Sequence, residues 1–111
     1  MKENKLLNKK CIPCTSRTSP LKGKSLQPYL QQLDPKWKMV EEHHLEREYL
    51  FKDFKTALDF VNKIGQVAEH EGHHPDLFLS WGKVKVTLWT HKINGLTESD
   101  FILAAKCDAL M

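Results

Sequence analysis

The clearest pattern along the chain is a helical repeat of apolar positions between residues 53 and 71. Lysine, glutamate and other polar residues stand between the apolar ones, so the apolar side chains share one face of a helix with 3.6 residues per turn. The repeat therefore predicts one long amphipathic helix over residues 53–71. Its apolar face is expected to consist of Phe54, Ala57, Leu58, Val61, Ile64 and either Val67 or Ala68.

Two pairs of short segments alternate apolar and polar residues with the period of a β-strand. The first pair, residues 37–43 and 45–51, comes before the long helix and predicts a hairpin with its turn at His43-His44. The second pair, residues 76–81 and 83–90, follows the helix and is divided by a glycine. Its alternation predicts a second hairpin.

A helix is expected at each end of this pattern. Residues 25–33 carry leucines at helical spacing after Ser25, which is placed to cap the helix. Near the C-terminus, Thr97 can cap a last helix, and Asp100 at its third position is interpreted as part of the cap. The order α-β-β-α-β-β-α predicts an α+β fold, a four-stranded antiparallel sheet with helices packed on one face. The uncovered face or edge is expected to hold a site or a second subunit.

Length and charge narrow the class of protein. A chain of 111 residues has room for one domain, and its apolar stretches are too short to cross a bilayer. Residues 1–24 hold seven of the 17 lysines and arginines and one acid, a formal charge of +6, which predicts a basic, loosely ordered N-terminal arm. Residues 25–111, the expected single domain, carry ten basic and 13 acidic residues, which argues against direct nucleic-acid binding. The arm lacks the apolar segment of a secretory signal, so a cytoplasmic location is expected, with an organelle-targeting segment left open.

Three of the six histidines are expected to meet at one end of the sheet. His73 and His74 stand between the long helix and the third strand, and His91 ends the fourth strand. The start of one strand and the end of its antiparallel partner are neighbours, which brings the three imidazoles together. Imidazole donates and accepts protons near neutral pH, so the cluster fits acid–base catalysis. Solvated loop histidines and a zinc site are the alternatives at this point.

Other residues of reactive or metal-binding types are interpreted without a catalytic role. Cys11-Ile12-Pro13-Cys14 is a single CxxC without a second pair at zinc-finger spacing, so incidental reduced thiols are favoured over metal or redox use. His43-His44, at the expected turn, is interpreted as solvated. Trp81 is expected to pack rather than to catalyse.

The spacing of these residues resembles the signature of the pterin-4a-carbinolamine dehydratases, also called 4a-hydroxytetrahydrobiopterin dehydratases. The resemblance covers residues 25–110 and rests on several spaced segments, which makes it more specific than a lone histidine pair. These segments are Glu69-x3-His73-His74-Pro75-x5-Trp81-x9-His91-x8-Asp100, Phe51-Lys52-Asp53-Phe54, Lys83-Val84-Lys85-Val86, Thr90-His91-Lys92 and Gly95-Leu96-Thr97.

The resemblance implies the four-stranded fold described above, assembly as a homodimer or homotetramer, and a lyase reaction that needs no cofactor and no metal. The reaction is dehydration of 4a-hydroxytetrahydropterin to the quinonoid dihydropterin, which recycles the cofactor of aromatic amino-acid hydroxylases. By motif position, the implied catalytic residues are His73, His74 and His91. The implied substrate-binding residues are Glu69, Gly72, Pro75, Trp89 and Thr90.

One departure and two alternatives accompany this interpretation. Some members of the family have an acidic residue directly before the histidine pair, and this chain has Gly72 there, so no carboxylate partner for His73 is expected from that position. Some relatives stabilise transcription-factor dimers or assist the assembly of other proteins, so a binding role without turnover is the first alternative. A zinc-binding module is the second.

Overall fold

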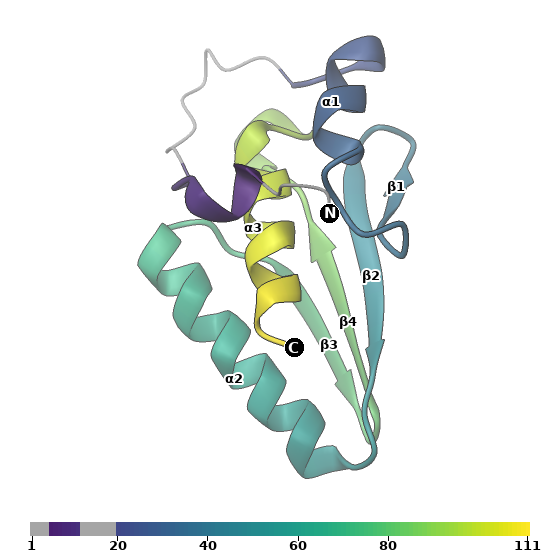
Figure 1. Cartoon of the computed structure of the whole chain (residues 1–111), viewed down its shortest axis with the longest axis vertical. Helices are drawn as coiled ribbons and strands as arrows, with labels where there is room; N and C mark the ends of the chain where they lie inside the picture. The colour runs from purple at the N-terminus through teal and green to yellow at the C-terminus, as the bar shows by residue number, and fades with distance from the viewer. Residues whose placement is uncertain (1–4, 12–19) are drawn as a thin grey trace.

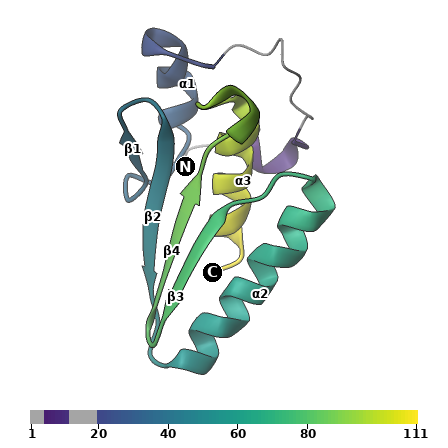
Figure 2. The same cartoon turned by 180° about the vertical axis from the view of Figure 1, so that it is seen from behind.

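The computed structural model describes residues 5–11 and 20–111 and shows a four-stranded antiparallel sheet with helices on one face (Figure 1). The strands lie in the spatial order β1-β2-β4-β3, and their bounds are β1 (Lys38–Val40), β2 (His44–Leu50), β3 (Asp76–Ser80) and β4 (Lys83–Leu88). The α-helices are α1 (Gln27–Leu30), α2 (Phe54–Glu71) and α3 (Glu98–Ala109), and the 3-10 turns are η1 (Lys5–Asn8), η2 (Gly23–Leu26) and η3 (His91–Ile93). Helix α3 passes in front of the strands in Figure 1 and behind them in Figure 2. The predicted α+β class and element order are confirmed.

Helix α2 begins and ends at residues with clear local roles. The Asp53 side chain accepts a hydrogen bond from the Thr56 N–H at 2.8 Å and so caps the first turn. At the other end, Gly72 adopts a left-handed conformation with φ 67°, and its N–H bonds to the Ala68 carbonyl. Glycine tolerates this conformation without steric strain, so the chain can reverse directly into β3. The predicted bounds of this helix agree with the structure within one residue.

The buried face of α2 differs from the predicted one. Ala57, Ile64 and Ala68 are buried as expected, but Phe54 and Leu58 are 45% and 38% exposed. Phe60 is buried instead, because its ring packs against the aromatic residues of β2 and the segment after it. Two faces of the helix carry apolar residues, so the sequence pattern alone does not determine which face is buried. The packing of the helix against the sheet determines it.

The core lies between the sheet and the two long helices. Tyr49 pairs with Val84 and Leu45 with Leu88 across β2 and β4, and these four side chains are buried on the same face. Helix α3 supplies the largest share of the core, because it is enclosed by β4, α2 and η1. Its buried apolar residues are Phe101, Ile102, Leu103, Ala104, Ala105 and Cys107.

The described residues before Ser25 take part in this packing. Leu6 is buried in the core cluster, and the Lys106 ammonium donates to the Leu7 carbonyl at 3.1 Å. The Leu21 N–H donates to the Leu96 carbonyl at 2.8 Å. Residues 5–11 thus lie against α3. Within residues 5–11 and 20–111, no helix is long and apolar enough to cross a membrane.

The first helix and the first hairpin differ from the predictions. The expected helix over residues 25–33 is a 3-10 turn followed by the single turn of α1. Ser25 is the third residue of that 3-10 turn, where its hydroxyl accepts from the Lys22 N–H, and not the N-cap of a helix. The first strand ends at Val40, because the turn covers Glu41, Glu42 and His43. His44, which was also expected in the turn, begins β2. Both glutamates have positive φ, a pattern typical of tight type I′ hairpins.

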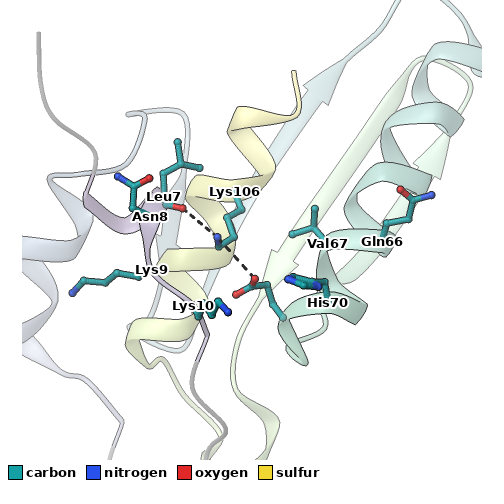
Figure 3. A pocket seen from close by; sticks show the side chains of 9 residues that line it. Leu7, Asn8, Lys9, Lys10, Gln66, Val67, His70 and Lys106 are labelled. Atoms are coloured by element: carbon teal, nitrogen blue, oxygen red, sulfur yellow. Dashed lines mark hydrogen bonds and ion pairs between the residues drawn. The ribbon is translucent and has the colours of Figure 1, made fainter.

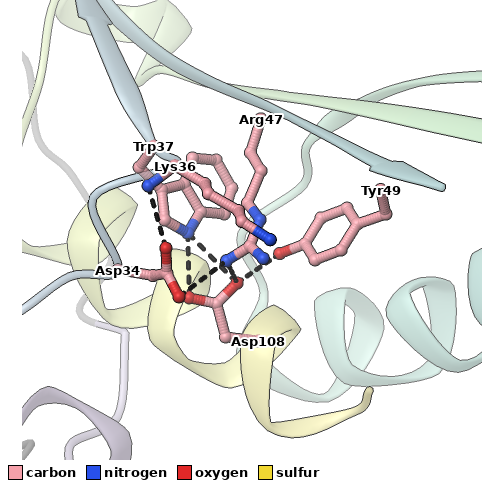
Figure 4. Close-up of polar contacts among 6 residues, drawn as sticks. All are labelled: Asp34, Lys36, Trp37, Arg47, Tyr49 and Asp108. Carbon is pink, nitrogen blue, oxygen red and sulfur yellow. Dashed lines mark hydrogen bonds and ion pairs between the residues drawn. The ribbon is translucent and has the colours of Figure 1, made fainter.

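A polar cluster ties the end of α3 to β2 (Figure 4). The Asp108 carboxylate accepts hydrogen bonds from the Trp37 indole at 3.0 Å, from the Arg47 guanidinium at 2.9 Å and from the Tyr49 hydroxyl. Asp34 lies 3.7 Å from the same guanidinium. Burial raises the pKa of Asp108 above its usual range despite these donors, and burial together with Asp108 raises the pKa of Tyr49.

Candidate active site

The end of α2, the start of β3 and the end of β4 together form a cavity of about 340 Å³ that contains all three histidines of the predicted cluster. The antiparallel pairing of β3 with β4, in which Asp76 lies opposite Thr87, brings these segments side by side. The cavity also contains four of the five expected substrate-binding residues, and Glu69 lies just outside it. Its lining residues are Gly72, His73, His74, Pro75, Asp76, Trp89, Thr90, His91 and Lys92.

His73 is oriented by a buried carboxylate. Its Nε2 lies 2.6 Å from Oδ1 of Asp100, whose side chain is fully buried at the start of α3. An ionised carboxylate only accepts, so Nε2 carries the proton and Nδ1 holds the lone pair of the neutral ring. The sequence pattern favours a capping role for Asp100, and Gly72 offers no carboxylate partner for His73. The partner comes from α3, 27 residues further along the chain.

Asp100 also forms the predicted cap. Its Oδ2 accepts from the Thr97 N–H at 2.9 Å and from the Thr90 hydroxyl at 2.8 Å, and the Thr90 and Thr97 hydroxyls lie 3.0 Å apart. The capping box of α3 is therefore confirmed. Since one oxygen serves the cap and the other faces His73, the cap fixes the carboxylate that orients the histidine.

His74 has a carboxylate partner of its own on the last turn of α2. Its Nε2 lies 2.5 Å from Oε2 of Glu69, and both side chains are largely exposed. An exposed ion pair contributes only about 0–1 kcal/mol to stability. The contact can nonetheless set the direction of the His74 imidazole.

His91 stands on a short loop that folds back on itself. Thr90 and Gly95 close the loop through backbone hydrogen bonds of 2.8 and 3.4 Å, and η3 begins at His91 between them. A Cβ on Gly95 would lie 2.8 Å from Pro20, so this close approach requires glycine. The Trp89 ring packs against the exposed His91 ring at a centroid distance of 4.0 Å.

Trp81 does not pack as expected. It is 66% exposed in the turn between β3 and β4 and lies outside the cavity. The next residue, Gly82, binds the Phe51 N–H through its carbonyl at 2.8 Å, and a Cβ on Gly82 would meet the Phe51 carbonyl. The turn itself is thus fixed by its backbone, and the indole is left on the surface.

The described residues do not gather a metal-binding set. Among residues 5–11 and 20–111, no three His, Cys, Asp or Glu side chains lie close enough to hold a metal ion. Burial and the nearby Glu71 carboxylate raise the pKa of the Cys11 thiol to about 12, and burial raises the pKa of Cys107 to about 12. Such thiols are poor nucleophiles. Cys14, the other half of the CxxC, lies outside the described residues.

A second cavity, of about 480 Å³, lies between η1, α2 and α3 (Figure 3). It is lined by basic side chains that make ion pairs: Lys9 lies 3.2 Å from Glu98, and Lys106 lies 3.9 Å from Glu71. The sequence pattern did not indicate this cavity, because it depends on how residues 5–11 pack. It lacks the paired imidazoles of the first cavity, which is therefore the candidate active site.

Comparisons with known proteins show which family this chain resembles. The family model described as Pterin 4 alpha carbinolamine dehydratase matches residues 19–110. A relative from Alkaliphilus metalliredigens, named as a pterin-4-alpha-carbinolamine dehydratase, is 60% identical over 105 residues and covers 95% of both chains. A relative of the same name from Rubrobacter xylanophilus is 50% identical over 107 residues, which make up 96% of this chain and 99% of that one.

Solved structures show the same fold. The crystal structure of a transcriptional coactivator/pterin dehydratase from Brucella Melitensis superposes with a TM-score of 0.77 and 36% identity, over 83% of this chain and 98% of that one. A pterin dehydratase-like protein identified as a RuBisCO assembly factor in the alpha-carboxysome shares the fold at a TM-score of 0.59 and 22% identity, over 68% of this chain and 88% of that one. With a family model over most of its length and relatives at this identity, the chain belongs to the pterin-4-alpha-carbinolamine dehydratase family of hydro-lyases.

Proposed function

We propose that this protein dehydrates 4a-hydroxytetrahydropterin to the quinonoid dihydropterin, with its histidines as acid and base. The observation that carries the proposal is the presence of three imidazoles in one cavity, two of which are oriented by carboxylates. A cavity of about 340 Å³ is within the range that binds small molecules.

The reaction needs one proton to be delivered and one to be removed. The N5 lone pair expels the 4a-hydroxyl group, the C4a–O bond breaks and the C4a–N5 double bond forms. An acid protonates the departing hydroxyl, which leaves as water, and a base takes the proton from N5. The net exchange consumes no proton, oxidant or reductant, so histidines in the two protonation states are sufficient.

We assign these transfers to His73, His74 and His91 as a group. In neutral His73, the Nε2–H is bound to Asp100 and Nδ1 has the lone pair of a base. His91 is exposed and rests on Trp89, so it can reach a substrate that enters the cavity. The family resemblance implies substrate contacts for Glu69, Gly72, Pro75, Trp89 and Thr90, and their position in or beside the cavity supports this proposal.

The proposed cellular role is recycling of the tetrahydropterin used by an aromatic amino-acid hydroxylase, in the cytoplasm. We also propose that the chain forms a homodimer or homotetramer. The partly exposed Phe54 and Leu58 on α2 and the free edge of β3 are surfaces that a second copy can cover. Light scattering of the purified protein measures its assembly directly.

The test of catalysis is the dehydration rate of His73→Ala and His91→Ala variants, followed by the ultraviolet change as the carbinolamine disappears. Each variant is expected to lower turnover by about 10²- to 10⁴-fold, the usual contribution of a general acid or base. His70→Ala is the matched control, because His70 is an exposed histidine of α2 that lines the second cavity. Wild-type turnover in both test variants would contradict the proposal.

A binding role is the second candidate, and the Brucella structure favours it because that protein carries the name of a transcriptional coactivator as well as a dehydratase. Binding to a protein partner would survive loss of the histidines. A pull-down with the His91→Ala protein separates the two roles, since partner capture without turnover indicates a binding surface outside the cavity. Metal analysis of protein purified without a metal-affinity step tests the zinc alternative, which one zinc per chain would support.

A further inference from the structure

A third aromatic ring packs against the Trp89–His91 pair, and it belongs to His43. The His43 ring packs against the Trp89 ring at a centroid distance of 4.5 Å, and Trp89 packs in turn against His91 at 4.0 Å. The Trp89 indole N–H donates to Asp76 at 3.3 Å. The residue that supports His91 is therefore held from both β3 and the β1–β2 turn, and the interpretation of His43 as a solvated residue is wrong.

His43 also binds the loop that carries His91. Its Nε2 lies 2.8 Å from Oδ1 of Asn94. Asn94 has a left-handed backbone with φ 52°, and its N–H donates to the His91 carbonyl at 3.3 Å, which closes the 3-10 turn. His43 thus contacts Trp89, which precedes His91 in the sequence, and Asn94, which follows it.

Both ring nitrogens of His43 are engaged. The amide oxygen of Asn94 accepts, so Nε2 of neutral His43 carries the proton and Nδ1 accepts. Nδ1 of His44 lies 3.0 Å from Nδ1 of His43 and is therefore the donor. A ring fixed at both nitrogens and on one face suits support of a neighbour and leaves no nitrogen for proton transfer to a substrate.

The turn that delivers His43 has a strained backbone. Glu41 and Glu42 have φ values of 53° and 56°, a conformation that costs roughly 1–2 kcal/mol for each non-glycine residue. The turn is held by the His43 N–H, which donates to Val40 at 2.9 Å, and by the Gly23 N–H, which donates to Glu42 at 3.2 Å. Strain of this kind is concentrated at functional sites, where surrounding contacts maintain it.

We propose that His43 is a positioning residue for His91, holding Trp89 and Asn94 so that the His91 imidazole keeps one orientation toward the cavity. This inference rests on the proposed dehydratase function of that cavity. A displacement of about 1 Å in a catalytic group can lower a rate by about 100-fold. We expect His43→Ala to lower kcat by about tenfold, with KM changed less than about twofold, because the effect is on chemistry rather than on binding.

The experiment compares His43→Ala with His43→Phe and His70→Ala. His43→Phe keeps a ring against Trp89 and is expected to recover part of the lost kcat. His70→Ala is the control, because it removes an exposed imidazole of α2 that lines the second cavity, and it is expected to keep kcat within about twofold of wild type. NMR of the His91 ring protons is the second readout, since the Trp89 ring current shifts them. These signals are expected to move in His43→Ala and to stay in place in His70→Ala.

The proposal is overturned if His43→Ala retains wild-type kcat, if His70→Ala loses as much kcat as His43→Ala, or if His43→Phe has no higher kcat than His43→Ala. Unmoved His91 signals in a folded His43→Ala protein overturn it as well. The NMR readout needs no substrate, so it separates the two hypotheses. A wild-type protein without turnover refutes the dehydratase function, while the His91 signals still test the positioning role.

Discussion

The contact between Asp100 and His73 allows a sharp test, because asparagine has nearly the shape of aspartate but only one acceptor oxygen. In the wild type, the two carboxylate oxygens accept from His73 Nε2, the Thr97 N–H and the Thr90 hydroxyl. In Asp100→Asn, an amide oxygen turned toward His73 would set the NH2 group against the Thr97 N–H, a contact between two donors. The opposite orientation keeps the cap but makes the NH2 group donate to His73 Nε2. The histidine must then carry its proton on Nδ1, and the nitrogen proposed as base is lost.

The expected magnitude follows from the bonds that change. A hydrogen bond to a charged group contributes about 1.5–3 kcal/mol and a neutral one about 0.5–1.5 kcal/mol. Loss of the charged contact to His73 therefore predicts a fall in kcat of about 10- to 100-fold, at 1.36 kcal/mol per decade. The two remaining bonds of the cap become neutral, which predicts a decrease of about 2 kcal/mol in the free energy of unfolding.

The assay pairs the dehydration rate with chemical denaturation, and Asp53→Asn is the matched control. Asp53 caps α2 through the same kind of bond, 2.8 Å to the Thr56 N–H, but does not contact the histidines. Asp53→Asn is expected to lower stability without changing kcat. Wild-type kcat in Asp100→Asn, or an equal loss of kcat in both variants, would refute the reasoning.

Three further predictions concern other parts of the molecule. Asp108→Ala leaves the buried Arg47 guanidinium without its closest acceptor and should lower the free energy of unfolding by about 3 kcal/mol in urea melts. Asp108→Asn should lower it less, and equal stability of the wild type and both variants would contradict a stabilising role of the Asp108 contacts. The Cys11 N–H holds the pKa of Glu71 below its usual value, so its carboxylate stabilises the fold above about pH 4.3 and less as the pH falls through the lowered pKa. The melting-temperature deficit of Glu71→Gln should therefore be present at pH 7 and shrink toward pH 3, and a deficit independent of pH contradicts this assignment. Burial raises the pKa of Cys11 and Cys107 to about 12, so iodoacetamide should alkylate both thiols about 1000-fold more slowly at pH 8 in the folded than in the denatured protein. Peptide mapping measures these rates, and equal rates in the two states would contradict the raised pKa values.

Local features of the sequence determined the elements of the fold. The cap at Asp53 and the glycine at position 72 mark both ends of α2, because each satisfies backbone groups within a few residues of itself. Alternation in residues 83–90 predicted a strand of the second hairpin, and the structure buries alternate residues of β4. The convergence of His73 and His91 was predictable for the same reason, since a hairpin makes the start of one strand and the end of the next neighbours.

Tertiary structure decided what depends on contacts between distant segments. The apolar residues of α2 allow two buried faces, and only docking against Tyr49 selects the one with Phe60. Asp100 lies 27 residues from His73 in the sequence, so the local pattern indicates only its capping role. Its contact with His73 exists because α3 packs beside the end of α2. His43 became a neighbour of Trp89 because the turn lies at two glutamates in a backbone conformation that their residue type disfavours. Periodicity records which way a side chain points within its own element, whereas the partner it meets depends on packing energies summed over the whole fold.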